Sequence, residues 1–426
     1  MSPTPNSTAL FQLKERYQSF IEENLKLDMT RGKPCFEQLN LSDGLLSNLQ
    51  HHDVALPLQD CRNYSSPDLL TGLYQMKNLL AEVLEISPQQ IIIGGNSSLN
   101  LMYDTIIKSL VHKLPRQTKS WSEQGRIKFL CPTPGYDRHF SICESFGIDM
   151  INVSLTGNGP DMDQIEKLVA NDHSIKGMWC VPKYSNPSGE SYSNDVIKRL
   201  AIMSTAANDF RIFWDNAYAM HHFNMNDQVK ILNILDECTK AGNPDRVFMF
   251  ASTSKITYAG AGIAIVATNK ENYDWLVKHL QSQTIGHDKI NQLRHLQLLP
   301  NKNAFFAHME KHANILKPKF DIVDKVLTNE LGTNGQFGCW HKPKGGYFIS
   351  FDSQPYLAKK IVNMAQEAGV KLTNAGATYP YGKDKNDCNI RIAPSLPNLA
   401  ELKKATEVLS VVTKIATLEQ NHIKHL

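Results

Sequence analysis

Residues 247–255, Val247-Phe248-Met249-Phe250-Ala251-Ser252-Thr253-Ser254-Lys255, pass from apolar side chains to hydroxyls and end on a lysine. The first four residues show no polar alternation, which is typical of a strand buried on both faces of a parallel sheet. Polar residues that directly follow such a strand lie at the edge of an open α/β sheet where ligands bind. The stretch therefore predicts an α/β fold and places Lys255 at the ligand-binding edge.

Six further apolar runs are similar to this one and are also predicted to be strands. They are residues 91–93, 129–131, 150–153, 178–181, 212–214 and 263–266. Stretches of helical length, such as residues 192–208, separate most of them. Strands that alternate with helices predict a mostly parallel central sheet sandwiched between helices, with right-handed crossovers.

The pattern changes near residue 290. Long helical stretches occupy residues 291–330, and two shorter strands with polar alternation follow at residues 347–351 and 389–392. This change predicts a second, smaller α+β domain, with which we expect the N-terminal segment to pack. The predicted large domain is residues 47–290, and the predicted small domain is residues 1–46 together with 291–426.

The composition excludes several classes of protein. The formal net charge of +3 comes from 45 basic and 42 acidic residues that form no basic stripe, so nucleic acid is not an expected partner. The first residues do not resemble a signal peptide, and no apolar run approaches the ~20 residues that span a membrane. We expect a cytoplasmic protein without a membrane partner. Its 8 cysteines are scattered singly and are expected to be small buried residues in a reducing compartment.

Polar segments follow five of the predicted strands. The carboxyl ends of parallel strands meet at one edge of a sheet, so we expect these segments to converge there. The segments are residues 94–98, 132–136, 182–189, 215–218 and 252–255.

Two residues of these segments indicate a particular chemistry. Lys255 is flanked by hydroxyls, and Asp215 lies 40 residues before it, at the end of another predicted strand. A lysine amine can condense with the aldehyde of pyridoxal phosphate, and an acid can keep the pyridine nitrogen of that cofactor protonated. The pair predicts a pyridoxal phosphate enzyme that acts at the α-carbon of an amino acid, with no metal at the site.

Four motifs together resemble the fold-type I pyridoxal phosphate aminotransferases of class I/II, and within them the type Ic aspartate aminotransferases. The resemblance extends from Thr30-Arg31-Gly32-Lys33-Pro34 to Arg391-Ile392-Ala393-Pro394. Its most distinctive strings are Asn186-Pro187-Ser188-Gly189, Asp215-Asn216-Ala217-Tyr218 and residues 252–262. Each string alone is weak, because a lysine after hydroxyls is usually a turn or a helix start. The order and spacing of the strings make the resemblance specific.

The resemblance implies the catalytic roles. Lys255 would bind the cofactor covalently and then move a proton as a general base. Asp215 would hold the pyridine nitrogen, and Asn186 and Tyr218 would form hydrogen bonds to the phenolic oxygen. Arg391 would bind the α-carboxylate of the substrate through a bidentate fork, for which arginine is better suited than lysine.

The resemblance also implies a phosphate site. The backbone N–H groups of Ser97 and Ser98, where a helix begins, would hold the phosphate, together with the hydroxyls of Ser252 and Ser254. Ser97 and Ser98 have a second interpretation as a simple helix cap, and the two roles are compatible because they use the same N–H groups.

Three further residues belong to the implied site. Tyr136 would stack on the cofactor ring, or it is a core aromatic. Gly32 and Asn186 would contact the substrate beside Arg391. Tyr64 would reach the phosphate of the neighbouring subunit, so the resemblance implies a homodimer with its sites at the interface.

The sequence departs from the wider family at two positions. The arginine that usually pairs with the phosphate, eight residues after the lysine, is replaced by Ile263. Lys33, Lys289 and Arg294 are the candidate replacements. The second arginine, which many aspartate enzymes use for the distal carboxylate, is not evident in residues 285–291.

Other clusters favour simpler interpretations. His308 and His312 lie one helical turn apart and would suit a metal, but we expect a solvated helix face. His221 and His222 are expected in a surface loop. Gly260-Ala261-Gly262 precedes a strand instead of opening a helix, so it is not a dinucleotide-binding fingerprint.

The combined reading predicts an aminotransferase. It would transfer an amino group from aspartate or glutamate to a 2-oxo acid such as 2-oxoglutarate, in two half-reactions of a ping-pong mechanism. Three alternatives stay open: an aminotransferase for alanine or aromatic amino acids, a β-lyase or decarboxylase on the same scaffold, and an inactive aminotransferase-like binding or regulatory protein.

Overall fold

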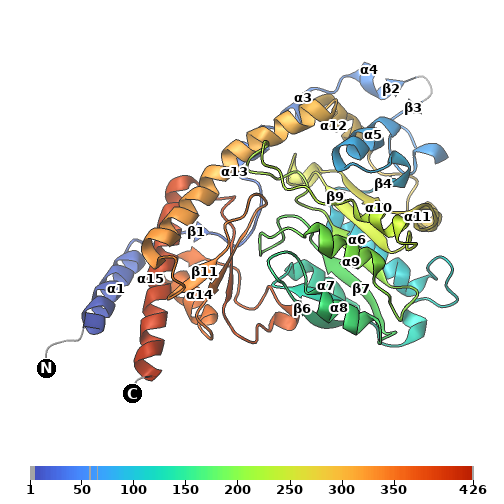
Figure 1. The fold of residues 1–426 in the computed structure, drawn as a ribbon. Helices are drawn as coiled ribbons and strands as arrows, with labels where there is room; N and C mark the ends of the chain where they lie inside the picture. The colour runs from blue at the N-terminus through green and yellow to red at the C-terminus, as the bar shows by residue number, and fades with distance from the viewer. Residues whose placement is uncertain (1–4, 57–58, 65, 425–426) are drawn as a thin grey trace.

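A seven-stranded sheet, here the large sheet, forms the centre of the larger part of the computed structural model, which describes residues 5–56, 59–64 and 66–424 (Figure 1). Its strand order is β4-β10-β9-β8-β7-β5-β6. All seven strands predicted from the apolar runs are present, with ends that differ by a few residues at most. They are β4 (Ile91–Ile93), β5 (Lys128–Thr133), β6 (Asp149–Ser154), β7 (Ile175–Cys180), β8 (Arg211–Asp215), β9 (Val247–Ser252) and β10 (Ala264–Ala267).

Only β10 of the large sheet runs against its neighbours, pairing antiparallel with both β4 and β9. The pairs β5–β6, β5–β7, β7–β8 and β8–β9 are all parallel. The mostly parallel α/β fold predicted from the sequence is therefore confirmed. Every strand of the sheet except β10 points its carboxyl end towards the same edge, and the five predicted polar segments follow there.

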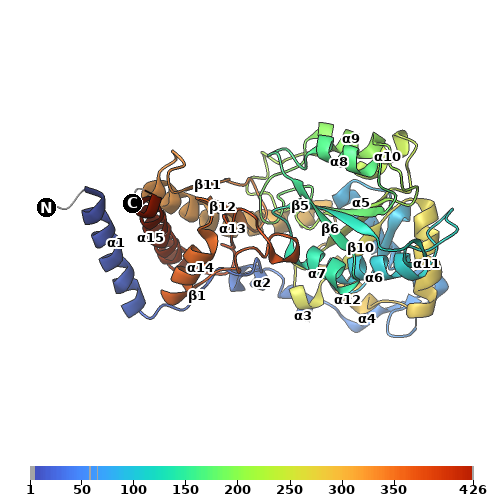
Figure 2. The ribbon, with the colours of Figure 1, turned by 90° about the horizontal axis from the view of Figure 1, so that it is seen from below.

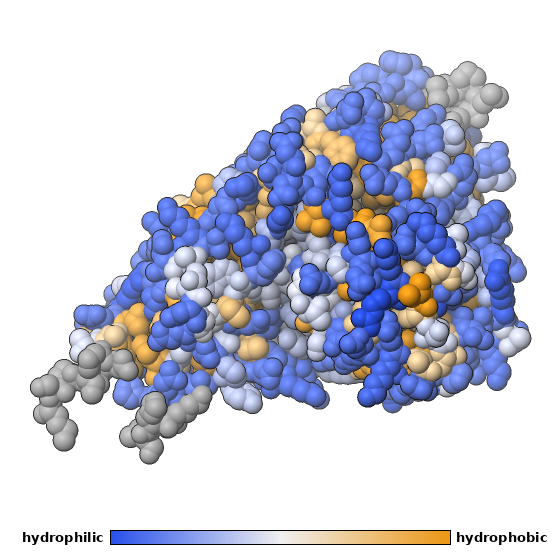
Figure 3. Space-filling view, in the orientation of Figure 1, coloured by the Kyte–Doolittle hydropathy of each residue, from blue (hydrophilic) through white to orange (hydrophobic). Residues whose placement is uncertain are grey.

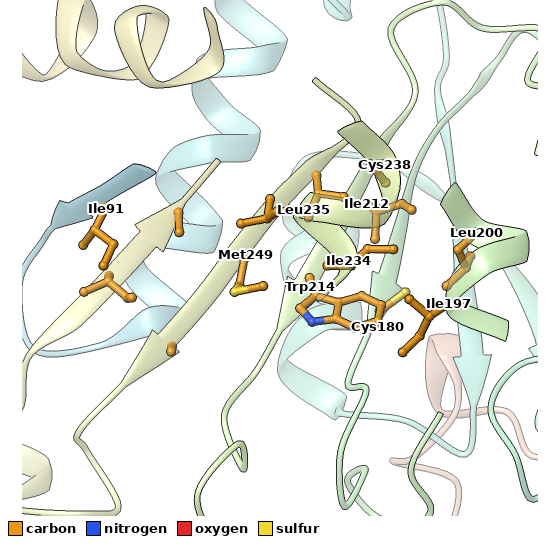
Figure 4. Packing of buried hydrophobic residues seen from close by; sticks show 14 of the residues in the cluster. Ile91, Cys180, Ile197, Leu200, Ile212, Trp214, Ile234, Leu235, Cys238 and Met249 are labelled. Atoms are coloured by element: carbon orange, nitrogen blue, oxygen red, sulfur yellow. The ribbon is translucent and has the colours of Figure 1, made fainter. Parts of the chain in front are cut away.

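Alternate residues of β8 enter opposite apolar layers, which explains why this strand shows no polar alternation. Ile212 and Trp214 pack in one layer, and Phe213 packs in the other. Figure 4 shows Trp214 beside Met249 of β9 and beneath Ile234 of α10 (Ile234–Lys240). Burial on both faces requires apolar residues at successive positions.

Helices cover both faces of the large sheet, as the sandwich prediction required, and Figure 2 shows the two layers. One face packs in the apolar core that contains Trp214, and its helices are α5 (Tyr74–Leu84), α8 (Met162–Val169), α9 (Asn194–Ile202) and α10. The other face packs in the core that contains Phe213, and its helices are α6 (Ser98–Val111), α7 (Asp137–Ser145) and α11 (Lys270–Gln283). The predicted helical stretch 192–208 is helical only over α9.

A three-stranded antiparallel sheet, here the small sheet, lies beside the large one in the order β11-β12-β14. Its strands are β11 (Gly338–Trp340), β12 (Ile349–Ser353) and β14 (Asn389–Ile392). The strand predicted at residues 347–351 therefore begins two residues later than expected. α14 (Ala358–Glu367) packs against this sheet and against α15 (Leu399–Lys424), and α1 (Pro5–Glu22) packs against α15.

The 30-residue helix α13 (Lys302–Leu331) joins the two parts of the molecule. Figure 1 shows it extending from α12 (Lys289–Leu298) to the small sheet. Phe305 of α13 packs in the core of the large sheet, whereas Phe320 and Leu327 pack in the core around the small sheet. The division into domains at residues 47–290, and 1–46 with 291–426, stays a prediction.

The short elements near the N-terminus connect both parts. β1 (Leu27–Asp28) pairs in parallel with β13 (Val370–Lys371). The others are α2 (Phe36–Asn40), α3 (Gly44–Ser47), α4 (His51–Val54), β2 (Ala55–Leu56) and β3 (Gln59–Asp60).

The surface shown in Figure 3 is mostly hydrophilic, with small apolar areas between charged and polar residues. Within the described ranges, no helix has the length and apolar character needed to cross a membrane. Six of the cysteines are buried as predicted, but Cys339 is exposed and Cys388 is half-buried. For Cys339 the prediction was wrong, because it lies on β11, at the end of the small sheet's strand order.

Gly369 allows the N-terminal segment to dock. Its φ is +81°, and a Cβ atom there would collide with the carbonyl oxygen of Leu25, while its own carbonyl accepts a 3.0 Å hydrogen bond from Leu27 N. We predict that Gly369→Ala lowers the free energy of unfolding by about 2–3 kcal/mol, from backbone strain and displacement of β1.

Urea unfolding of the two proteins measures this loss. Gly242→Ala is the matched control, because Gly242 has φ +78° with no atom near the position of a Cβ. It should lose only the cost of the left-handed backbone, about 1 kcal/mol. Equal losses for both variants would contradict the docking role of Gly369.

Candidate active site

A cavity of about 580 Å³ opens at the carboxyl edge of the large sheet and is closed on its other side by residues next to the small sheet. Every predicted site residue except Tyr64 lines it. These residues are Gly32, Ser97, Ser98, Tyr136, Asn186, Asp215, Tyr218, Ser252, Ser254, Lys255 and Arg391. The convergence of the predicted polar segments follows from the parallel direction of the strands that precede them.

Asp215 ends β8 and is only 3% exposed. One carboxylate oxygen, Oδ2, lies 3.0 Å from Nε2 of His139. The other, Oδ1, is buried and has no hydrogen-bond partner among the described residues. A buried carboxylate oxygen without a partner is costly, so this atom is suited to a cationic or N–H group of a ligand in the cavity.

His139 was not identified from the sequence. It lies on α7, three residues after Tyr136, and its ring stacks on Trp179 with 4.2 Å between ring centres. The stacking holds the imidazole in place, so His139 orients Asp215 from the side opposite Oδ1. The one-turn spacing from Tyr136 was the only available signal, and it becomes informative only once α7 is known to begin at Asp137.

Lys255 lies in the turns that follow β9, where its amine is close to two aromatic rings. Nζ is 5.2 Å from the ring centre of Tyr218 and 5.8 Å from that of Tyr347. Burial lowers the pKa of the Lys255 amine, and the charge of Asp215 partly opposes that shift. A lowered pKa increases the share of uncharged amine at neutral pH, and the uncharged amine is the nucleophilic form.

Two tyrosines bound the same cavity. Burial raises the pKa of Tyr218 well above its usual value, and it raises the pKa of Tyr136 to about 12, with Asp215 and Asp137 contributing to the latter. Both hydroxyls are therefore protonated at neutral pH and available as hydrogen-bond donors. Tyr136 meets His139 edge to face, with 4.9 Å between ring centres.

Arg391 of β14 is held on three sides. Its Nη1 donates to Oδ1 of Asp137 over 2.8 Å and to Oδ1 of Asn186 over 3.4 Å, and its Nη2 donates to Oγ1 of Thr373 over 3.2 Å. The guanidinium lies over the ring of Phe348 at 5.0 Å. Nε is buried with no partner in the described part of the chain. The group is thus oriented, and its Nε retains an N–H for an anion.

The opposite end of the cavity is lined by hydroxyls and a helix N-terminus. Ser97 is the N-cap residue of α6, and its side chain makes no capping hydrogen bond. Oγ of Ser252 lies 2.9 Å from Oγ of Ser254, which donates to the carbonyl oxygen of Asn96 over 3.0 Å. A 14-residue helix that begins here favours an anion through its free N–H groups.

The candidate cations for this anion are separated in the structure. Ile263 is buried and leaves no charge at the position that it occupies. Lys33 lines the main cavity, whereas Lys289 and Arg294 line two other cavities. Tyr64 is 80% exposed and shares the cavity of Lys289, so within one chain it does not meet the other site residues.

Two sequence expectations about histidines were wrong. His308 and His312 are buried on α13 and contact the carbonyl oxygen of Ile256, so they do not form a solvated face. His221 and His222 are buried too, and His221 lies 3.4 Å from the carbonyl oxygen of Lys255. In each case the helix or loop packs beneath the lysine turn, a contact between distant segments that no local pattern records.

The fold and the cavity define the class: an α/β protein with the aminotransferase fold, a seven-stranded mixed sheet and a smaller antiparallel sheet. An aspartate transaminase of Corynebacterium glutamicum superimposes with a TM-score of 0.94 at 40% identity, over 99% of this chain and 98% of that one. An α-aminoadipate aminotransferase of Thermus thermophilus, 20% identical, shares the fold with a TM-score of 0.73 over 95% of this chain and 96% of that one.

The sequence comparisons identify the family. An aspartate aminotransferase of Corynebacterium glutamicum is 42% identical over 409 residues, which cover 96% of this chain and 93% of the relative. The chain belongs to the aspartate amino-transferase family, which it matches over residues 1–425.

Gly32 supports Arg391 indirectly, through Phe348. A Cβ atom on Gly32 would collide with the ring of Phe348, the ring that lies under the guanidinium. We predict that Gly32→Ala displaces Phe348 and raises KM for the amino-acid substrate about tenfold, because the guanidinium loses its orientation.

Steady-state kinetics on the purified variant measures this change. Gly260→Ala is the control, since nothing lies near the position of its Cβ. A Gly32→Ala protein with the KM of the unmodified protein would mean that Phe348 can move without disturbing Arg391.

Proposed function

We propose that the protein is an aspartate aminotransferase that uses pyridoxal 5′-phosphate bound to Lys255. It would transfer the amino group of aspartate or glutamate to a 2-oxo acid such as 2-oxoglutarate in a ping-pong reaction. The observation that carries the proposal is that one cavity contains Lys255, the unpartnered carboxylate oxygen of Asp215 and the oriented guanidinium of Arg391. Membership of the aspartate amino-transferase family supports it.

The donor set fits the cofactor. The hydroxyls of Ser252 and Ser254 and the N-terminus of α6 suit its phosphate, and Oδ1 of Asp215 suits its pyridine N–H. The Thermus thermophilus relative, which shares the fold, was solved with N-(5′-phosphopyridoxyl)-L-leucine. When bound, this cofactor supplies an electron sink for the electron pair left at the substrate α-carbon.

The protein side chains would then position the substrate and move a proton. Arg391 would bind the α-carboxylate, which would replace Asp137 as its partner. The Lys255 amine, whose pKa is lowered by burial, would accept the proton from the α-carbon of the substrate and would then donate it to the C4′ carbon of the cofactor. Tyr218 and Asn186 would donate hydrogen bonds to the phenolic oxygen. His139 would keep the Asp215 carboxylate facing the ring nitrogen.

The absorbance spectrum tests the proposal directly. Adding pyridoxal phosphate to the purified protein should produce a visible band that disappears with aspartate and returns with 2-oxoglutarate. Lys255→Ala should lower turnover by about 10³-fold or more, because both the covalent attachment and the general base are lost.

Lys270→Ala is the control, since Lys270 is an exposed residue of α11 that pairs with Asp274. If the visible band disappears with alanine and not with aspartate, the amino donor is alanine. If the products are pyruvate and ammonia, the enzyme is a β-lyase, and if carbon dioxide is released, it is a decarboxylase. If no visible band forms after pyridoxal phosphate is added, the proposal is wrong.

We also propose a homodimer in a cytoplasmic location. Tyr64 and Lys289 line one cavity that is separate from the main cavity of their own chain. Tyr64 and Ile285 of this second cavity are large apolar residues with exposures of 80% and 60%. A second copy of the chain that covers this surface would bury both residues and bring Tyr64 to the site of its neighbour.

Two cations are proposed to select substrates with a second carboxylate. Arg31 and Arg138 are exposed residues that line the main cavity, and neither belongs to an ion pair within the described ranges. Arg31 precedes Gly32, and Arg138 follows Asp137, so both lie next to residues that contact or support Arg391. Their charges suit the distal carboxylate of aspartate better than a phosphate at the α6 end.

We predict that Arg31→Ala and Arg138→Ala each raise KM for aspartate, and that the larger effect is about tenfold, because one charged hydrogen bond is lost. KM for alanine should be unchanged. Measuring both substrates on each variant makes alanine the internal control. If KM for aspartate and KM for alanine change equally, or if neither changes, these arginines do not determine the preference for a second carboxylate.

A further inference from the structure

The carbonyl groups of Lys255 and Ile256 are bound by side chains instead of backbone. Residues 254–258 follow the end of β9 in turns, and no backbone N–H of the described residues is bonded to the carbonyl oxygens of Lys255 and Ile256. Buried carbonyls need such partners, so side chains from elsewhere must provide them. Tyr347 Oη donates to Lys255 O over 3.2 Å, and His221 Nε2 lies 3.4 Å from the same oxygen.

Two histidines of α13 share the next carbonyl. Nε2 of His308 lies 2.7 Å from Ile256 O, and Nε2 of His312 lies 2.9 Å from it. The two Nε2 atoms are 3.1 Å apart because they share one acceptor. Both must carry hydrogen on Nε2 to donate, and one carbonyl oxygen has two lone pairs to receive them.

One amide, that of Gln38, supports both carbonyls from a distance. Gln38 Nε2 donates to Nδ1 of His312 over 2.9 Å and to Oη of Tyr347 over 2.9 Å. Its Oε1 accepts from the backbone N–H of Cys35 over 3.2 Å. The side chain is fully buried on α2, and each polar atom has a partner. Two relays therefore run from one amide to two consecutive carbonyls.

The relays have a defined direction. Burial and the neighbouring His308 lower the pKa of His312 to about 3, and burial also lowers the pKa of His308. Both imidazoles are neutral at physiological pH. His312 therefore accepts at Nδ1 from Gln38 and donates at Nε2 to Ile256 O, and Tyr347 accepts from Gln38 and donates to Lys255 O.

We infer that Gln38 is a positioning residue for Lys255: through Tyr347 and His312 it fixes the carbonyls of Lys255 and Ile256 and so the place of the lysine amine. The long lysine side chain has many rotamers, so its amine is placed only if its backbone is held. The inference rests on the proposed function, because the place of the amine matters for catalysis only if Lys255 reacts. It also links the amine to residues 30–33, since α2 begins shortly after that cavity segment.

The test uses the holoenzyme with pyridoxal phosphate and three variants. Gln38→Met removes both donors at similar volume, and Tyr347→Phe removes only one hydroxyl. Tyr184→Phe is the matched control: Tyr184 is as buried as Tyr347, and its hydroxyl lies 2.6 Å from His222 Nδ1, away from the Lys255 carbonyl. Thermal unfolding of each cofactor-free protein reports the purely structural cost.

A positioning role predicts effects beyond stability. Gln38→Met and Tyr347→Phe should each lower kcat about tenfold, with KM for aspartate within about twofold, because small displacements of a reacting group are costly. The pH midpoint of the visible cofactor band, measured without substrate, should move by about half a unit, as the amine shifts relative to Asp215. The double variant should resemble the Gln38→Met single variant, since Tyr347 acts within one of the two relays that begin at Gln38.

Tyr184→Phe should lose comparable stability but keep the midpoint and kcat of the unmodified protein. Two results would overturn the inference: variants whose midpoint and kcat match those of Tyr184→Phe, or effects of the two changes that simply add. If Gln38→Met does not fold, Tyr347→Phe decides alone. An unmodified protein without the visible band would contradict the proposed function itself, which is a separate outcome.

Discussion

The parallel hydrogen bonding of β5, β7, β8 and β9 is the constraint on which the rest of the molecule depends. Parallel strands end at a common edge, so the segments after them meet there even though more than a hundred residues separate the first from the last. Asp215 and Lys255 end or follow neighbouring strands, and Asp215 pairs in register with Phe250. The pairing of β8 with β9 therefore brings Asp215 and Lys255 to the same part of the sheet edge, independently of any contact between their side chains.

Burial gives these groups their chemical character. The cavity edge is enclosed by the large sheet, α7 and residues near the small sheet, and this enclosure lowers the pKa of the Lys255 amine while raising those of Tyr136 and Tyr218. The same enclosure makes unpartnered polar atoms expensive. Oδ1 of Asp215 and Nε of Arg391 are such atoms, and they lie on side chains that line one cavity. Both atoms are therefore suited to polar or charged groups of a ligand in that cavity.

The small sheet and α13 complete the site from the other side. Arg391 comes from β14, and the histidines beneath the lysine turn come from α13, a helix that packs in both apolar cores. The carbonyl oxygens of Lys255 and Ile256 lie in the turn after β9, beyond the hydrogen bonds of the sheet. Side chains therefore supply their hydrogen-bond donors. The contacts that satisfy these carbonyls are thus the ones from which we infer the placement of the Lys255 amine.

Apolar runs without alternation were sufficient to predict the large sheet, because each of its buried strands carries that signal locally. The acid, the lysine and the serines line the cavity as expected, because their strings follow those strands, whereas Arg391 lies within β14 of the small sheet and was expected only from the family resemblance. Three features were not predictable: the contact of His139 with Asp215, the ion pair of Asp137 with Arg391, and the burial of His308 and His312. Each depends on where a helix packs against a segment far away in the chain. The sequence by itself determined the secondary structure of the large sheet and the residue types at its edge, because these follow from local patterns of polarity. Only the tertiary structure decided which polar atoms are paired and which are left for a ligand, because that depends on distances between segments that are remote in sequence.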